Sequence, residues 1–221
     1  PLPTRGALYS PDSTLYNRET VPIKAMTAHE EDILTSQAFI KEGTVISQLL
    51  SSCLTDKSIQ VNDLTLGDRN SIMTAVRITG YGSEYKVIAK CESCNASNKV
   101  CVNLSNLDIK RLELKPIEPG KNEFEYTLPV TKKKVTFKFM TVRDEIDRSK
   151  ASQSLANMKF ESNITTYLRY VLLSVGGVRD KTKISHFVRH MPAFDSKSLR
   201  KFINEHEPGI DMTENFTCDK C

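Results

Sequence analysis

The sequence contains no tryptophan, and aromatic residues make up only 7% of its 221 residues. It also lacks an apolar run near the ~20 residues that a membrane-spanning helix needs, since Arg169 interrupts the longest candidate, residues 167–178. No apolar stretch follows residues 1–5, so a signal peptide is not expected there. These absences predict a cytosolic protein, in which cysteines stay reduced and paired cysteines favour metal over disulfides.

Strong charge is missing as well. The formal net charge is +4, and 39% of the residues are hydrophobic. This composition is ordinary for a globular protein that is long enough to bury a core in one domain or two. A nucleic-acid-binding protein usually has a strongly basic face, so the weak charge and the scarce aromatic residues disfavour that class.

The motifs of common enzyme classes are also missing. His186 and His190 have the i, i+4 spacing of a metal-chelating pair, but the glutamate of a zinc protease signature does not lie between them. Acidic clusters at residues 30–32 and 144–147 lie in expected first helical turns, where the helix dipole favours carboxylates. No glycine-rich phosphate loop and no nucleophile with a histidine partner stands out. The sequence therefore predicts a protein that is not an enzyme.

The most informative residues present are two Cys-x-x-Cys pairs, Cys91/Cys94 and Cys218/Cys221. Each pair has the spacing with which two thiolates bind one metal from a tight turn, and together they supply the four sulfurs of a structural Zn²⁺ site. A zinc ribbon places its two pairs about 15–20 residues apart, whereas residues 95–217 lie between these two. If one ion binds both pairs, the residues between them form an insertion that the metal closes at its base.

Other interpretations of the cysteines stay open. Two disulfides, four free thiols or a thioredoxin-like redox pair would have the same sequence pattern. Alternating residues on both sides of the first pair, 85–90 and 99–104, favour a knuckle between two strands, which is the zinc-ribbon arrangement. One shared site is favoured over two half-sites, because a lone pair leaves the ion two ligands short. Of the other cysteines, Cys53 is expected to be buried on a helix and Cys101 to pack on a strand.

The chain as a whole predicts an α+β fold, with a mainly helical body, β-hairpins and a zinc-ribbon-like four-cysteine site that holds a long insertion. The expected parts are an extended N-terminal arm (1–26), a helical segment (27–82), a zinc-ribbon-like module (83–106 with 214–221) and an inserted hairpin and helical region (107–213). The arm is rich in Pro, Ser and Thr and is expected to become ordered only against something else, such as a partner, with a disordered tail as the alternative.

Local sequence patterns predict where several helices begin or end. Thr27 and Glu30 match a capping box, which predicts the first helix. The most apolar helix is expected over residues 163–175, before two glycines that end it. Asp195 or Ser196 is expected to cap the last helix.

Several short segments follow one another in a fixed order. They are residues 26–35 and 64–70, Gly80-Tyr81-Gly82, the first cysteine pair, residues 191–196 and the closing cysteine pair. In this combination the chain, over roughly residues 20–221, resembles the baseplate hub assembly proteins of T4-like contractile-tailed bacteriophages. The family's pattern usually continues past the second cysteine pair, so the chain is expected to be truncated there.

The resemblance implies a non-enzymatic, chaperone-like factor in tail assembly, with other phage baseplate hub proteins as partners. A permanent structural subunit of the baseplate is the first alternative, and a zinc-ribbon nucleic-acid-binding protein is the second. The expected location is the host cell cytoplasm during assembly, with the virion baseplate as a further location. A homo-oligomer is left open, and no membrane partner is expected.

Overall fold

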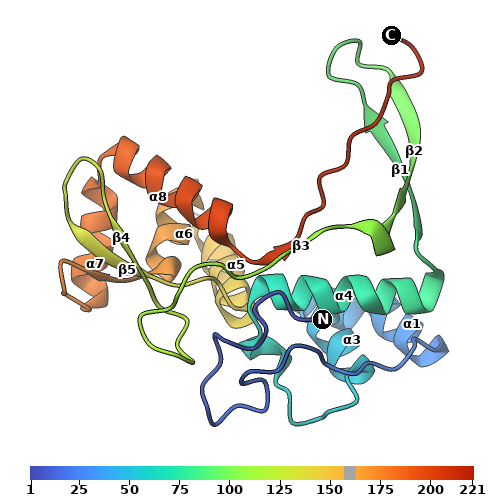
Figure 1. Ribbon diagram of the computed structural model, residues 1–221, viewed down its shortest axis with the longest axis horizontal. Helices are drawn as coiled ribbons and strands as arrows, with labels where there is room; N and C mark the ends of the chain where they lie inside the picture. Colours follow the sequence, from blue (N-terminus) through green and yellow to red (C-terminus); the bar gives the residue numbers. More distant parts are fainter. Residues whose placement is uncertain (157–162) are drawn as a thin grey trace.

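The computed structural model of the chain describes residues 1–156 and 163–221. Helices and small antiparallel sheets make up the fold, which confirms the expected α+β class. Figure 1 shows a broad body from which a two-stranded ribbon projects, with the C-terminus at the tip of the ribbon. Among the described residues, no helix is both long and apolar enough to cross a membrane.

The first part of the body is a helical cluster. Its helices are α1 (Ala28–Thr35), α2 (Gln37–Glu42), α3 (Val45–Cys53), the 3-10 turn η1 (Val61–Asp63) and α4 (Leu66–Tyr81). Glu30 completes the predicted capping box, because its carboxylate accepts bonds from the N–H and the hydroxyl of Thr27 at 2.9 and 2.5 Å. Lys24 and Ser52 donate to the same carboxylate, and these bonds hold the pKa of Glu30 well below its usual range.

The second part of the body is a three-stranded antiparallel sheet with helices against it. The sheet has the strand order β4 (Phe124–Thr127), β5 (Lys134–Phe137), β6 (Leu172–Val175). Its helices are α5 (Val142–Ala156), α6 (Asn163–Val171), α7 (Lys181–His190) and α8 (Ala193–His206). The core here includes the buried rings of Phe124, Phe137 and Phe139, whose centroids lie 4.8, 5.5 and 6.0 Å apart.

The single helix expected over residues 163–175 is wrong in its second half. Helix α6 ends at Val171, and the next four residues form β6, which pairs with β5. The hydroxyl of Ser174 donates to that of Thr136 across the pair, at 2.9 Å. An apolar run is compatible with a helix or with a strand. Here the unpaired edge of the β4–β5 hairpin determines that these four residues form a strand. Pairing with β6 gives partners to backbone groups of β5 that would otherwise face the core alone.

The N-terminal segment, residues 1–26, packs on the body and is not the free arm that the sequence predicts. Leu2, Leu8 and Leu15 are 0%, 4% and 3% exposed. The backbone here forms successive turns in place of a helix or strand, so the buried residues follow no regular period. The segment is therefore ordered by this chain alone, without a partner.

A buried hydrogen-bond network joins this segment to the start of α4. The carboxylate of Asp68 is fully buried and accepts the N–H and the hydroxyl of Thr4, at 3.0 and 2.5 Å, and the hydroxyl of Tyr9 at 2.5 Å. Thr65, the N-cap of α4, donates its own N–H to the Tyr9 hydroxyl. Burial raises the pKa of both Asp68 and Tyr9. The N-terminal segment thus supplies partners that this buried carboxyl would lack without it.

The expected capping of α8 by Asp195 or Ser196 is wrong, because both residues lie inside the helix. The helix begins at Ala193 after Pro192, and the buried Asp195 carboxylate accepts the N–H groups of Val130 and Thr131 at 2.7 and 3.1 Å. Burial raises the pKa of Asp195, but these bonds outweigh that effect, and the pKa is lowered overall. The charged side chain therefore ties the turn between β4 and β5 to α8.

Replacing this side chain tests its role. We expect Asp195→Ala to lower the free energy of unfolding by about 2 kcal/mol, because two N–H groups lose their acceptor. Lys197→Ala on the exposed side of the same helix is the control and should change stability by less than about 0.5 kcal/mol. Denaturant unfolding measures both, and equal stability of the two variants would contradict this role.

The ribbon consists of β1 (Glu84–Lys90) and β2 (Ser97–Asn103), paired antiparallel along their whole length. It leaves the body after α4 and returns through η2 (Leu104–Asn106). At its base, β3 (Ile109–Lys110), which is labelled in Figure 1, pairs with β7 (Gly209–Ile210). A Cβ on Gly67 would lie 1.9 Å from the carbonyl oxygen of Pro208. Glycine at this position of α4 therefore lets the chain pass close to the helix.

Candidate metal centre

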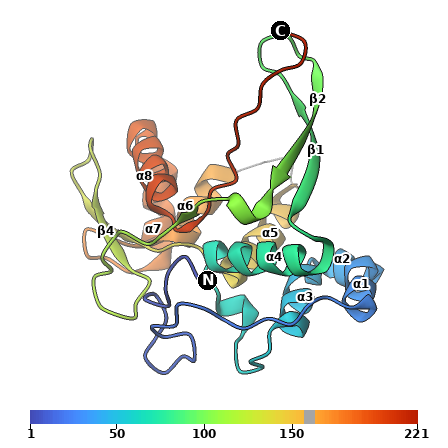
Figure 2. The same ribbon diagram turned by 45° about the vertical axis from the view of Figure 1, so that its right-hand side comes forward.

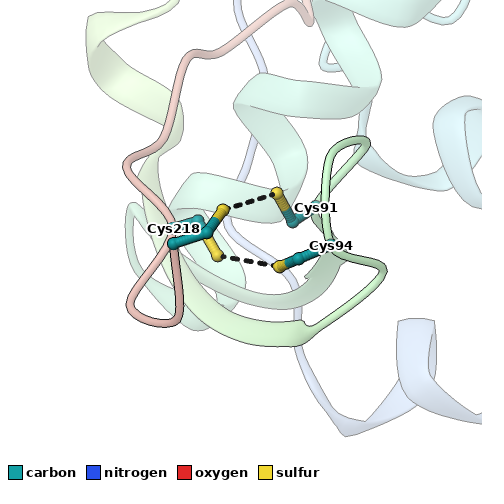
Figure 3. A group of neighbouring side chains, drawn as sticks. Cys91, Cys94 and Cys218 are labelled. Atoms are coloured by element: carbon teal, nitrogen blue, oxygen red, sulfur yellow. Dashed lines mark hydrogen bonds between the residues drawn. The ribbon is translucent and has the colours of Figure 1, made fainter.

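The first cysteine pair lies in the tight turn between β1 and β2, where the sequence predicts a knuckle. The N–H of Cys91 donates to Ala96 O, and the N–H of Asn95 donates to Cys91 O, both at 2.9 Å. Asn95 has a φ of 56°, a left-handed conformation that asparagine adopts more readily than most residues. The turn places the side chains of Cys91 and Cys94 on the same side, toward the C-terminus (Figure 3).

The second pair reaches this turn at the end of the chain, and Asn98 holds the two knuckles together. Asn98 is 4% exposed, its amide donates to Ala96 O at 3.0 Å, and its carbonyl accepts the N–H of Asp219 at 3.0 Å. The sequence interpretation missed this residue. Its only local signal is a polar side chain on the same face of β2 as Val100 and Val102.

The four sulfurs converge on one point. The Sγ atoms of Cys91 and Cys221 are 3.7 Å apart, as are those of Cys94 and Cys218, and all four lie within 4.8 Å of one another. Zinc–sulfur bonds of about 2.3 Å in a tetrahedron place sulfur pairs at about 3.8 Å, whereas a disulfide needs about 2.0 Å. The donor set and its spacing therefore fit one tetrahedral metal ion shared by both pairs.

The backbone of the two turns favours thiolates. The N–H of Cys94 lowers the pKa of Cys91, and the N–H of Lys220 lowers the pKa of Cys218 to about 6. Contacts with the other three sulfurs raise the pKa of Cys221 to about 12. Four thiolates at this spacing repel one another. A divalent cation at their centre would offset this repulsion and allow the fourth thiol, Cys221, to lose its proton.

The remaining candidates are placed elsewhere. Cys53 is fully buried in the core of the helical cluster, as predicted, whereas Cys101 is exposed and the expected packing of its side chain is wrong. The ring centroids of His186 and His190 lie 4.4 Å apart with the ring planes tilted by 33°, and Nδ1 of His190 is 2.8 Å from His186 O. Within the described residues, the group of His, Cys, Asp or Glu side chains that could hold a metal is the four-cysteine cluster.

Comparison with known protein families decides the kind of protein. The family model described as T4 bacteriophage base plate protein matches residues 10–221, nearly the whole chain. The chain belongs to this family. The resemblance seen in its short segments is thereby confirmed, and the chain is a phage base plate protein whose partners are other baseplate proteins. No curated protein and no solved structure matches it.

Proposed function

We propose that this base plate protein is a non-enzymatic assembly factor of the baseplate hub, acting in the host cytoplasm while the tail is built. The family match over residues 10–221 carries the proposal. The four-cysteine centre supports it, because protein sulfurs would fill all four positions of a tetrahedral metal, as in structural zinc sites, and would leave none for a substrate. Other hub proteins are its proposed partners.

The alternative is a permanent subunit of the baseplate. Both roles predict that the chain associates with baseplate proteins in infected cells, so the test is its fate. We expect quantitative mass spectrometry to detect the chain in baseplate intermediates and to find it depleted from purified mature particles. A stoichiometric amount in mature particles would identify a permanent subunit, and association with no baseplate protein at either stage would reject both roles.

We also propose that Cys91, Cys94, Cys218 and Cys221 hold one structural Zn²⁺. Metal analysis of the purified chain should give about one zinc per molecule, and the cluster thiols should react with a thiol reagent only after a chelator removes the metal. Cys101→Ser is the matched control, because this exposed cysteine lies on β2 outside the cluster. The zinc content of this variant should equal that of the wild type. A zinc-free protein with all cluster thiols reactive would contradict the assignment.

A further inference from the structure

The ribbon has one basic face, on which three lysines outnumber the single carboxylate of Glu84 at the start of β1. The register pairs Ile88 with Lys99 and places Lys86 and Lys90 two residues to either side of Ile88, so these four side chains share one face. All four are exposed, and Ile88 is 72% exposed. In the described part of the chain, none of the three lysines takes part in an ion pair. We call these four residues the lysine face.

A complementary segment lies at the other end of the sequence. Residues 211–217 carry the carboxylates of Asp211 and Glu214 and no cation, and every one of these residues is exposed. Met212 and Phe216 are 64% and 36% exposed. We call this stretch the acidic segment. It has the charge opposite to the lysine face, and it offers apolar side chains that could cover Ile88.

Within one chain, the acidic segment does not pair with the lysine face. The acidic segment is fixed before its start by the β3–β7 pairing and after its end by the cysteine cluster. Between these points it runs beside the ribbon and joins it only at the tip, in both views of Figures 1 and 2. The ribbon sheet contains two strands, β1 and β2, so the acidic segment is not a third strand within the described residues.

We propose that the lysine face of one copy of this chain binds the acidic segment of a second copy, in a reciprocal dimer. Each strand of the ribbon has seven residues, and the acidic segment has a matching length of about 23 Å when extended. In a two-fold symmetric dimer the same contact forms twice, so the total buried interface area is double that of one contact. The dimer does not depend on whether the protein stays in the virion.

Charge reversal tests the proposal on the full chain, purified without chelator. We expect sedimentation equilibrium to show a dimer at tens of micromolar. The triple variant Lys86→Glu, Lys90→Glu and Lys99→Glu should weaken the dimer at least tenfold, because attraction becomes repulsion at each exposed contact. The double variant Asp211→Lys and Glu214→Lys should do the same. High salt should weaken the wild-type dimer as well.

Mixing the two reversed variants gives the decisive result. A heterodimer pairs the reversed lysine face with the reversed acidic segment and leaves the other contact native, so mixing should restore association to near the wild-type level. The matched control reverses three exposed lysines outside the ribbon, Lys41, Lys115 and Lys197, with the same change in net charge. This control should still dimerise, and circular dichroism should show that every variant is folded.

Several outcomes would overturn the proposal. A wild-type chain that stays monomeric in this concentration range would reject the second copy as the occupant. Reversed variants that dimerise normally, or a mixture that fails to associate, would show that these two surfaces do not meet. Equal loss of the dimer in the Lys41, Lys115 and Lys197 control would assign the effect to net charge alone.

Discussion

Removing residues 1–22 from this base plate protein is expected to leave a chain that is insoluble or that unfolds far below the temperature of the full-length protein. The deletion removes Leu2, Leu8 and Leu15, each of which is buried in one of the two cores. Burying a leucine side chain contributes about 1.5–3 kcal/mol, and a domain of this size is stable by about 5–15 kcal/mol in total. The lost burial alone is therefore comparable with the whole stability.

The deletion also leaves a buried carboxyl without its donors. Asp68 would lose the bonds from Thr4 and Tyr9, and an unsatisfied buried polar group costs about 1–3 kcal/mol. Tyr9→Phe tests the part that depends on the Tyr9 hydroxyl, because it removes the bonds to Asp68 and Thr65 and keeps the ring. We expect it to lower the free energy of unfolding by about 1–3 kcal/mol.

Matched substitutions separate packing from the network. Leu2→Ala should lower the free energy of unfolding by about 2–5 kcal/mol, whereas Val130→Ala, at a side chain that is 52% exposed, should have little effect. Thermal unfolding followed by circular dichroism measures each variant. If the chain without residues 1–22 melted within a few degrees of the full chain, the N-terminal segment would be a cover over the surface and not part of the core.

The N-terminal segment shows why sequence patterns missed part of this fold. Local sequence signals predict helices such as α1. The capping box of Thr27 and Glu30 is sufficient to place the start of this helix. The buried residues of the N-terminal segment follow no helix or strand period, because successive turns bring them to the core. Nothing local distinguishes such a segment from a disordered arm of the same composition.

Two further errors have the same origin. The apolar run after Val171 was assigned to a helix, but its conformation is decided by a strand edge that lies about 40 residues earlier in the chain. Asp195 follows a proline at a helix start, where a capping role is the ordinary expectation, yet its partners are in a distant hairpin turn. In both cases a tertiary contact outweighs the local preference.

The start of α4 illustrates the opposite case, in which the residue types of a short segment reflect tertiary contacts. Thr65 caps the helix, Gly67 lets Pro208 approach, and Asp68 receives the N-terminal segment. These three contacts explain why each position holds its residue type. The sequence alone, however, does not identify the partner residues. The cysteine cluster is similar, because the spacing of each pair indicated the ligands while Asn98, which joins the two turns, gave no comparable signal.

Removing the proposed metal from the four-cysteine centre is expected to disorder the ribbon and the C-terminal segment while leaving most of the helical structure. The two cores contain Cys53 but none of the four cluster cysteines, so each core can form without the site. The ribbon depends on the site far more, because a two-stranded hairpin is at best marginally stable by itself. The metal proposed at its tip would fasten the far end of the ribbon to the C-terminal segment and would close a long loop.

Cys91→Ser tests this dependence. Far-UV circular dichroism should retain most of the helical signal, while amide hydrogen exchange of β1, β2 and residues 211–221 should rise by at least tenfold over the wild type. Treating the wild-type protein with a chelator should give the same exchange pattern, because both changes empty the same site. Cys101→Ser changes a thiol on the same ribbon outside the cluster and should leave exchange unchanged.

The pattern of protection distinguishes three possible roles for the proposed metal. If Cys91→Ser abolished the helical signal, the site would be required for the body to fold, as in small zinc-dependent domains. If exchange in the ribbon stayed at the wild-type level, packing alone would hold it, and the cluster would be dispensable for structure. Loss of protection confined to the ribbon and the C-terminal segment would show that the metal organises a projecting element on a body that is stable without it, which is the outcome we expect from the separation of the cluster from both cores.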